Sequence, residues 1–434
     1  MKRLLAALCG VIATTSAGWA ADAPVATNGG TATPAATVAQ NWTATLDSEV
    51  RYFSWKSGLG FPPGTADGTG GSGSQLYIPY GLQLVGLPND NIKIEIVGRG
   101  GWVHSRQSTN QQSGEVRTTT DTVVSATATY LGLDGIQPFA SVNFNIPTGQ
   151  AALFGSAANT RMDPDLVDIA SFGEGFNFGP TIGLTVAIAS NLITTVSVGY
   201  TQRGAFRREG TPTLVNPFAL GPPIDPGDVV TATATIAHQV GQLAGTITGS
   251  VSSETATKQD GAQQFKPGTR YLISGSWAYT WPEMQGVTTL TASLSHAKPN
   301  KALFELPATP RFDSEPFNSN SNLYRIGLEH LFPIGMLSLG PTGSYLYRDH
   351  NGYNSATLQF VPAKERWSAG ALARYAASEK VSFNARVERV WVHESVSYPG
   401  TPFSLLTESL IPIQGVPAIS STGWQSAVGA NVSF

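Results

Sequence analysis

The sequence has 434 residues, of which only 13% are Asp, Glu, Lys or Arg, whereas ordinary soluble domains contain about 25%. Its 47 glycines and 28 prolines follow no period of three, which excludes a collagen-like chain and disfavours a compact helical bundle. The formal net charge of −3 provides no basic surface for a phosphate backbone, so no nucleic-acid partner is expected.

Residues 1–20 have the pattern of a secretory signal peptide. Lys2 and Arg3 precede an apolar stretch, and small residues stand before a cleavage point after Ala20. The only cysteine, Cys9, lies in this segment, so the exported chain is expected to contain no disulfide.

Residues 21–40 consist mainly of Ala, Thr, Pro and Gly. A segment with so few bulky side chains buries too little surface to order itself, so we expect a short flexible N-terminal lead. The sequence after it contains no apolar stretch of the roughly 18 residues that a membrane-spanning helix requires. An exported chain of this kind is either soluble or a membrane barrel, and the periodicity of the remaining sequence distinguishes the two.

From residue 41 onward, apolar and polar residues alternate with a period of two, which is typical of β-strands with two different faces. In the first segment Trp42, Leu46 and Val50 lie on one face. Asp47 and Arg51 lie on the other face. Similar alternation occurs in residues 92–97, 270–281 and 381–388. Because soluble antiparallel sheets also alternate, the connections between the strands decide the assignment.

Short turns and long loops alternate strictly along the chain. The short turns are predicted at residues 87–91, 132–135, 189–191, 240–242, 281–286, 332–335 and 377–380. Long segments rich in Gly, Pro, Asn and Ser lie near residues 58–74, 105–114, 147–176, 204–227, 253–268, 297–321, 349–363 and 395–421. These connections separate about sixteen strands, and they predict an all-β fold, a transmembrane antiparallel β-barrel over residues 41–434 with short periplasmic turns and long external loops.

The outside of the predicted barrel faces outer-membrane lipid. In hydrocarbon an unpaired backbone group costs several kcal/mol, so the sheet is expected to close and leave no free edge. By parity Arg386 points into the lumen, and its neighbour Val387 points toward lipid. Aromatic residues at the strand ends are expected to form interfacial girdles, and they are Trp42, Tyr80, Trp102, Tyr130, Tyr200, Trp281, Tyr324, Trp367, Trp391 and Trp424.

The last strand carries a resemblance to a known group of proteins. Trp424, Val428, Ala430, Val432 and Phe434 share one face, and the chain ends on Phe434. This pattern resembles the terminal signal of Gram-negative outer-membrane proteins. The resemblance implies assembly in the cell outer membrane by the barrel insertion machinery, with Trp424, Val432 and Phe434 as the assembly signal.

The strand count, the size and the position of the longest loop resemble the sixteen-stranded general porins in architecture. Residues 80–87 and 226–240 also resemble a family associated with a MetA pathway of phenol degradation, which is thought to form channels for aromatic compounds. Both resemblances imply an outer-membrane channel. In porins the third external loop folds into the lumen and narrows it, and residues 147–176 form the third external loop here.

This loop is rich in charged residues, which are Arg161, Asp163, Asp165, Asp168 and Glu174. Parity places basic residues on the inner wall opposite it, and they are Arg51, Lys93, Arg99 and Arg117. We predict that the two groups line a pore constriction, where an acidic loop facing a basic wall sets up a transverse field. The alternative is that the acids cap a turn or form local ion pairs.

The sequence therefore predicts a passive outer-membrane channel for small solutes. Two alternatives stay open, a channel for aromatic or hydrophobic compounds and a surface adhesion or receptor barrel without a transport role. No enzyme activity, cofactor or metal is expected, because Gly68, Gly70 and Gly73 match a phosphate-binding pattern only in a loop without a following helix, and neither HExxH nor GxSxG occurs. A homo-oligomer also stays open.

Overall fold

The structure is a computed structural model, and it describes residues 42–56, 71–108, 113–165, 167–210, 218–282, 286–304, 311–355, 357, 359–395 and 418–434. The expected signal peptide (1–20), the expected lead (21–40) and the loop glycines Gly68 and Gly70 lie outside the described residues.

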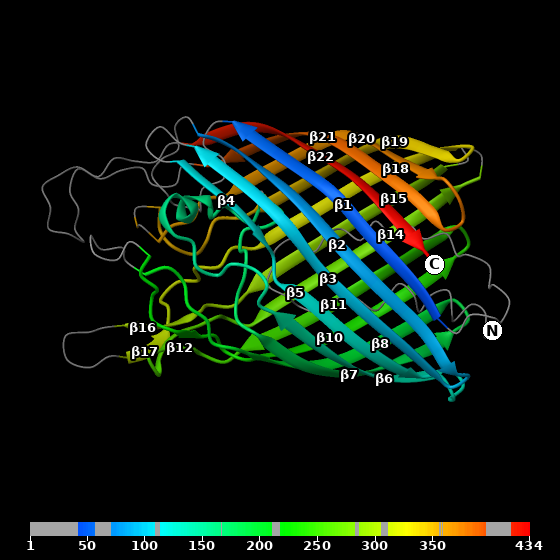
Figure 1. Cartoon of the computed structure of the whole chain (residues 1–434), viewed down its shortest axis with the longest axis horizontal. Helices are drawn as coiled ribbons and strands as arrows, with labels where there is room; N and C mark the ends of the chain where they lie inside the picture. Colours follow the sequence, from blue (N-terminus) through cyan, green and yellow to red (C-terminus); the bar gives the residue numbers. More distant parts are fainter. Residues whose placement is uncertain are drawn as a thin grey trace, which may run out of the picture.

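Sixteen antiparallel strands form one closed barrel (Figure 1), which confirms the predicted fold. They are β1 (Trp42–Lys56), β2 (Ser72–Asn89), β3 (Ile92–Ser108), β4 (Ser113–Thr119) continued by β5 (Thr122–Tyr130), β6 (Ile136–Ile146), β7 (Asn177–Ala189), β8 (Leu192–Arg203), β10 (Val229–Val240), β11 (Leu243–Glu254), β14 (Arg270–Trp281), β15 (Gly286–Ala297), β18 (Leu323–Ile334), β19 (Leu337–Arg348), β20 (Lys364–Ala376), β21 (Val381–Glu394) and β22 (Ile419–Ser433). Each strand pairs with its neighbours in sequence, and β1 pairs with β22. The ring therefore has no free edge to leave unpaired in hydrocarbon.

The two ends of the barrel differ as predicted. Short turns connect the strands at the end where the chain terminates, called the turn end here, and the long loops lie at the opposite, loop end (Figure 1). One turn lies later than expected, because β18 continues to Ile334 and the chain reverses at Gly335. Gly335 has a φ of 65°, a left-handed value that glycine adopts without the steric cost of a side chain.

The long loops contain a small second sheet that the sequence did not indicate. Its strands are β9 (Ile224–Asp225), β12 (Thr257–Gln259), β13 (Ala262–Lys266), β16 (Lys301–Phe304) and β17 (Arg311–Ser314). These strands have two to five residues each, too few to show a period. No helix in the described ranges is long and apolar enough to cross a membrane.

A β-bulge between β4 and β5 changes which residues face the lumen. Trp102 pairs with Thr119 and Arg99 pairs with Val123, so three steps on β3 correspond to four on the bulged strand. One extra residue exchanges the inward and outward positions of all residues that precede it in the strand, which here are those of β4. The inward position predicted for Arg117 is therefore wrong, and Arg117 lies on the outer face beside His104.

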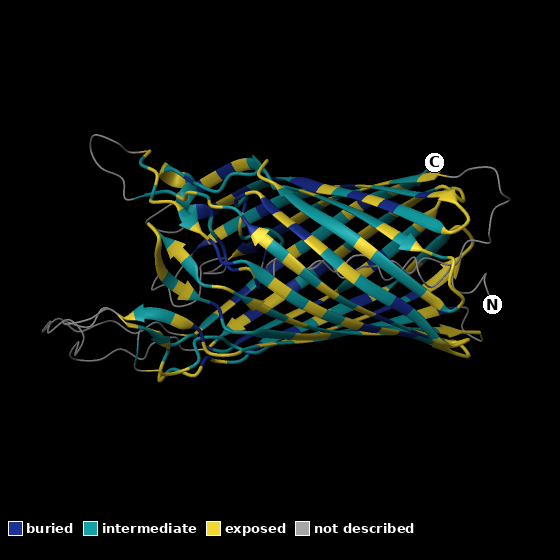
Figure 2. Ribbon diagram, turned by 90° about the horizontal axis from the view of Figure 1, so that it is seen from below, coloured by how far each residue is buried: buried dark blue, intermediate teal, exposed yellow. Residues whose placement is uncertain are grey.

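The outer face of the barrel is largely apolar. Exposed Leu46, Val50, Ile182, Val198 and Val428 belong to it, and Figure 2 shows the resulting stripes of exposed residues that alternate along each strand. Charged side chains of the described barrel strands mostly face inward, and the outward ones are Lys56, Arg106, Glu115, Arg117, Glu365 and Arg389. An apolar outside and a polar inside are what a barrel in a bilayer requires.

Candidate channel lumen and its docked loop

The inner wall has two sectors. The charged sector covers β18–β22 and β1–β3 and presents Arg325, Glu329, Arg348, Lys364, Arg366, Arg374, Arg386, Glu388, Glu394, Asp47, Glu49, Arg51, Lys93, Glu95 and Arg99. The hydroxyl sector covers β5–β15, where inward positions are mainly Thr, Ser and Asn and charges occur only at the loop end. Its hydroxyl groups bond across strands, as between Thr185 and Thr195 at 2.9 Å. Both sectors present polar groups that replace part of a solute's water shell.

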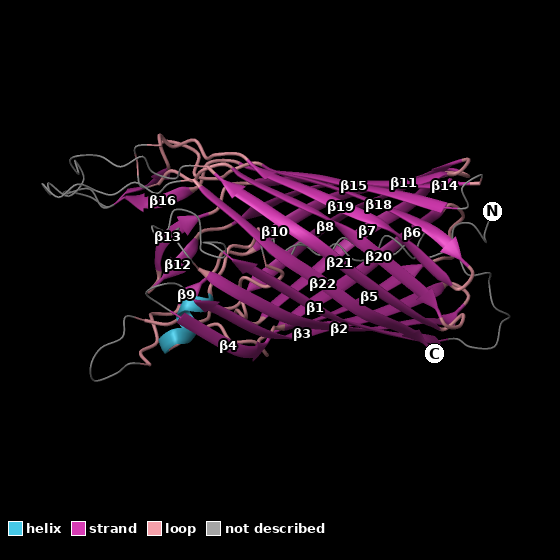
Figure 3. Ribbon diagram, turned by 90° about the horizontal axis from the view of Figure 1, so that it is seen from above, coloured by secondary structure: helices cyan, strands magenta, loops and turns pink. Residues whose placement is uncertain are grey.

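Residues 147–176 pack against the inside of the barrel wall. Leu153 and Phe172 are 0% and 1% exposed, and they pack with Val103 and Val116, which point inward from β3 and β4. The short helix η1 (Gly155–Thr160) lies beside β4 at the loop end (Figure 3). Gly114 permits this close approach, because a Cβ there would lie 2.4 Å from the Ser156 carbonyl oxygen.

A second apolar cluster attaches the middle of the loop to β1 and β21. Met162 and Val167 are buried against Phe53 and Trp55 of β1 and against Val390 and Val392 of β21. All four strand residues share the inward parity. The loop is therefore fixed by apolar burial to β1, β3, β4 and β21.

Backbone groups of the loop bond to two side chains of the barrel wall. Gln75 on β2 accepts a hydrogen bond from the Ile169 N–H at 3.0 Å and donates one to the Ile169 carbonyl at 2.8 Å. Asp121, in the bulge, accepts from the Gly149 N–H at 2.9 Å and from the Glu174 N–H at 2.8 Å. One carboxylate thus ties the first and last parts of the loop together.

Two of the predicted loop acids are buried in an ion network with the charged sector. Asp163 is 0% exposed and pairs with Lys364. Asp165 pairs with Arg348 at 2.7 Å. Glu394 completes the network at 2.9 Å from Lys364 Nζ. These acids meet β19–β21 and not the predicted Arg51, Lys93, Arg99 and Arg117.

Two other charged residues of the loop pair with residues outside it, Arg161 with Glu209 in the next long loop and Glu174 with Arg203 on β8. Arg161 donates two hydrogen bonds to Glu209, both at 2.9 Å. Burial opposes the ionisation of Glu209, but the bonds from Arg161 and from the Leu153 N–H outweigh it and lower its pKa to about 2. Glu174 lies 3.5 Å from Arg203, and burial raises its pKa above the ordinary value.

Asp168 is the predicted loop acid that faces a predicted wall cation. Its carboxylate lies 3.7 Å from the Arg51 guanidinium, and the two side chains are 38% and 25% exposed. Lys93 pairs with Glu95 at 3.3 Å, and Arg99 is exposed on the same wall. The loop and β1 therefore meet through a solvent-accessible ion pair.

A further charged group, which is not among the predicted site residues, lies on the inner wall beyond the loop. Glu329 accepts hydrogen bonds from Arg374 at 3.0 Å and from Arg386 at 3.3 Å. Arg386 also lies 3.9 Å from Glu388. Glu329 and Glu388 are 11% and 2% exposed, whereas Arg374 and Arg386 keep 28% and 32%. The solute side of this group is therefore formed mainly by guanidinium donors.

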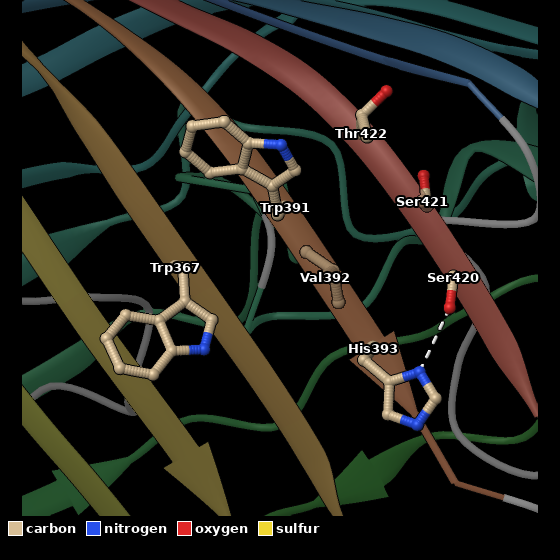
Figure 4. A pocket seen from close by; sticks show the side chains of 7 residues that line it. All are labelled: Trp367, Trp391, Val392, His393, Ser420, Ser421 and Thr422. Carbon is tan, nitrogen blue, oxygen red and sulfur yellow. Dashed lines mark hydrogen bonds between the residues drawn. The ribbon is translucent and has the colours of Figure 1, made fainter.

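A shallow pocket of about 380 Å³ lies among the external aromatic residues of β20–β22 (Figure 4). Trp367 and Trp391 border it, and His393 Nδ1 lies 3.0 Å from Ser420 Oγ. Trp367 and Trp391 are about half exposed, at 52% and 43%, and face away from the lumen by register. The described residues contain no cluster of three or more His, Cys, Asp or Glu that could hold a metal ion.

The chain matches no family model and no curated protein. Among solved structures it is similar to Pseudomonas aeruginosa OccK3 (OpdO), with 8% identity over 91% of this chain and 96% of that chain and a TM-score of 0.41. It is also similar to a TodX mutant, a monoaromatic hydrocarbon channel, with 12% identity over 91% of each chain and a TM-score of 0.40. OmpT, an outer membrane protein of Vibrio cholerae, shares 10% identity over 91% of this chain and 98% of that chain, with a TM-score of 0.38.

The barrel itself defines the class of protein. It is closed, antiparallel and sixteen-stranded, with an apolar outside, a polar inside, tight turns at one end and long loops at the other. Such a barrel is an outer-membrane barrel with porin-like architecture and a polar interior.

Proposed function

We propose that this protein is a passive channel for small polar solutes and that residues 147–176 form its constriction. The observation that supports the proposal is the burial of this loop against the inner wall by two apolar clusters. A loop that occupies part of the lumen leaves less room for solute at that level. Nothing in the proposal requires catalysis.

The charges that a solute meets differ from those first predicted. Asp163 and Asp165 are buried and paired with Lys364 and Arg348 of the wall, so a solute does not meet these carboxylates directly. Asp168 and Arg51 keep exposed surface, and low-dielectric walls focus the field of charges in such a place. We therefore assign ion preference at the constriction to Asp168 and Arg51.

Reversal potentials across a salt gradient in a planar bilayer test this assignment. Asp168→Asn removes one lumen charge with little change of volume, so cation preference is expected to fall. The effect is expected to be larger at low salt, because the screening length is about 10 Å at 0.1 M and about 3 Å at 1 M.

Asp313→Asn is the matched control, because Asp313 lies on β17 of the loop sheet and pairs with Arg311. It is expected to behave as the wild type. If Asp168→Asn and Asp313→Asn have the same reversal potential as the wild type, Asp168 does not face the permeating ions.

The two alternative functions lead to different expectations. A surface adhesion or receptor barrel is expected to conduct no ions through its lumen. A channel for aromatic or hydrophobic compounds is expected to line its path with apolar groups. The described inner wall is instead mainly charged and hydroxylated, which supports polar solutes.

A further inference from the structure

The outer face of β3 and β4 carries a charged cluster near the loop end, which we call the outer basic patch. It consists of His104 and Arg106 on β3 and of Glu115 and Arg117 on β4. His104 pairs with Arg117 and Arg106 pairs with Glu115 in the register. The four side chains point away from the lumen, because Val103 and Val116 have the opposite parity and are buried against the loop inside.

Glu115 is the common partner within the outer basic patch. Its Oε1 atom lies 3.0 Å from His104 Nε2, 3.2 Å from an Arg106 nitrogen and 2.7 Å from an Arg117 nitrogen. One carboxylate cannot use all the donors of two guanidinium groups, each of which has five N–H bonds. Arg106 and Arg117 are 54% and 61% exposed. The patch is therefore net positive and offers free donor directions to its surroundings.

The outward residue pairs on either side of the outer basic patch place it at the level of lipid headgroups. Toward the turn end, Ile78 and Trp102 form an outward pair, and the Trp102 ring lies 6.0 Å from the His104 ring. Toward the loop end, Ser72 and Ser108 form the next outward polar pair. Tryptophan is enriched at the membrane interface, and arginine on the lipid face is tolerated there far better than at the midplane of the bilayer.

Outward charge is concentrated in this sector of the barrel. Of the six outward charged side chains in the described barrel strands, Lys56, Arg106, Glu115 and Arg117 lie on β1, β3 and β4. Lys56 is exposed and pairs with Ser72 in the register. Arg389 lies elsewhere and stacks 5.1 Å above the Trp424 ring. The lipid surface of the barrel thus has one sector with an excess of cations.

We propose that the outer basic patch binds the phosphate group of an outer-leaflet lipid. Guanidinium groups bind phosphate through pairs of parallel hydrogen bonds, and Arg106 and Arg117 present such donors on adjacent strands. The acyl chains of the same lipid extend from its headgroup toward the turn end and lie along Ile78 and Trp102. This site is outside the lumen and is independent of the channel function.

Native mass spectrometry in detergent tests the proposal, with diphosphorylated lipid A as the probe and its dephosphorylated form as the comparison. The wild-type protein is expected to retain the diphosphorylated form at least tenfold more strongly. The double variant Arg106→Gln/Arg117→Gln is expected to lose this preference. Arg389→Gln is the matched control and is expected to keep it, because Arg389 also faces outward but lies outside the patch.

Equal retention of both lipid forms by the wild-type protein would overturn the proposal by itself. The test therefore does not depend on whether the double variant folds. Equal retention by the wild type and a folded double variant would overturn it as well. Displacement of the lipid by an equal concentration of inorganic phosphate would show a site for free anions and would contradict the lipid assignment.

Discussion

At the scale of single residues, parity along a strand decides which side chains a membrane tolerates. Val387 is 48% exposed on the outer face near the middle of β21, and Arg386 faces the lumen. Val387→Arg is expected to destabilise the barrel by about 2–4 kcal/mol. Arg386→Gln is expected to fold, because Glu329 keeps its bond to Arg374. Unfolding in lipid vesicles measures both, and an unchanged free energy of unfolding for Val387→Arg would show that the register of β21 is wrong.

Glu209, in the long loop after β8, gives a pH dependence whose sign follows from its pKa. Because the folded-state pKa of about 2 lies below the ordinary value of 4.5, the bonds from Arg161 and Leu153 contribute stability above pH 4.5. This stability is lost as the pH falls toward 2. The protection factor of the Leu153 amide in hydrogen exchange is expected to stay constant from pH 7 to pH 5 and to decrease below it. Glu209→Gln is expected to remove this dependence, and a decrease that persists in the variant would assign it to another group.

Partners far apart in the chain explain which site residues could not be predicted. Asp165 meets Arg348 across 183 positions and Asp163 meets Lys364 across 201 positions. Local alternation indicates that such residues face inward, but it does not distinguish a buried partner from one exposed to solute. The alternation therefore predicted the inward positions of Arg51, Lys93 and Arg99 correctly. It could not distinguish the buried Asp163 from the exposed Asp168.

At the scale of elements, the docked loop depends on the bulge between β4 and β5. Asp121→Ala removes the acceptor for the Gly149 and Glu174 amides, and hydrogen bonds to a charged group contribute about 1.5–3 kcal/mol each. Protease cleavage within residues 147–176 is expected to become roughly tenfold faster or more. Asp349→Ala is the control, because Asp349 accepts two bonds from Asn322 in another loop. Equal cleavage of the two variants would show that Asp121 does not anchor this loop.

The same bulge marks the limit of periodicity as a guide. Alternation with a period of two predicts the two faces of a strand only where the register is continuous. One inserted residue at the bulge moved Arg117 from the predicted inner face to the outer face. The short strands of the second sheet were missed for a related reason. Segments of two to five residues contain too little alternation to separate a strand from a loop.

The closing strand β22 is the element on which assembly is expected to depend. Phe434 N–H donates to the Ala44 carbonyl at 2.8 Å, and β22 pairs with both β1 and β21. Deletion of Phe434 is expected to reduce the yield of folded barrel far more than deletion of a few residues between 21 and 40. Heat-modifiable migration of membrane fractions measures the yield, and equal yields from the two deletions would contradict a role of Phe434 in assembly.

At the scale of the whole molecule, strand number, closure and the positions of the long loops followed from the sequence, because the bilayer imposes them on every strand. The solvent on each side fixes the alternation, and unpaired edges are excluded in hydrocarbon. The division of the lumen into a charged and a hydroxyl sector became visible only with the register. It gives the channel two different walls, and the docked loop contacts the charged one.

The central claim is that ions pass through the lumen beside the docked loop. It is tested most directly by single-channel recording of Asp168→Cys, since the only cysteine of the chain lies in the expected signal peptide. Addition of a bulky cationic thiol reagent is expected to reduce the current stepwise in Asp168→Cys and to leave Asp313→Cys unchanged. If the modified Asp168→Cys channel carries the same current as before, the loop does not line the path of the ions.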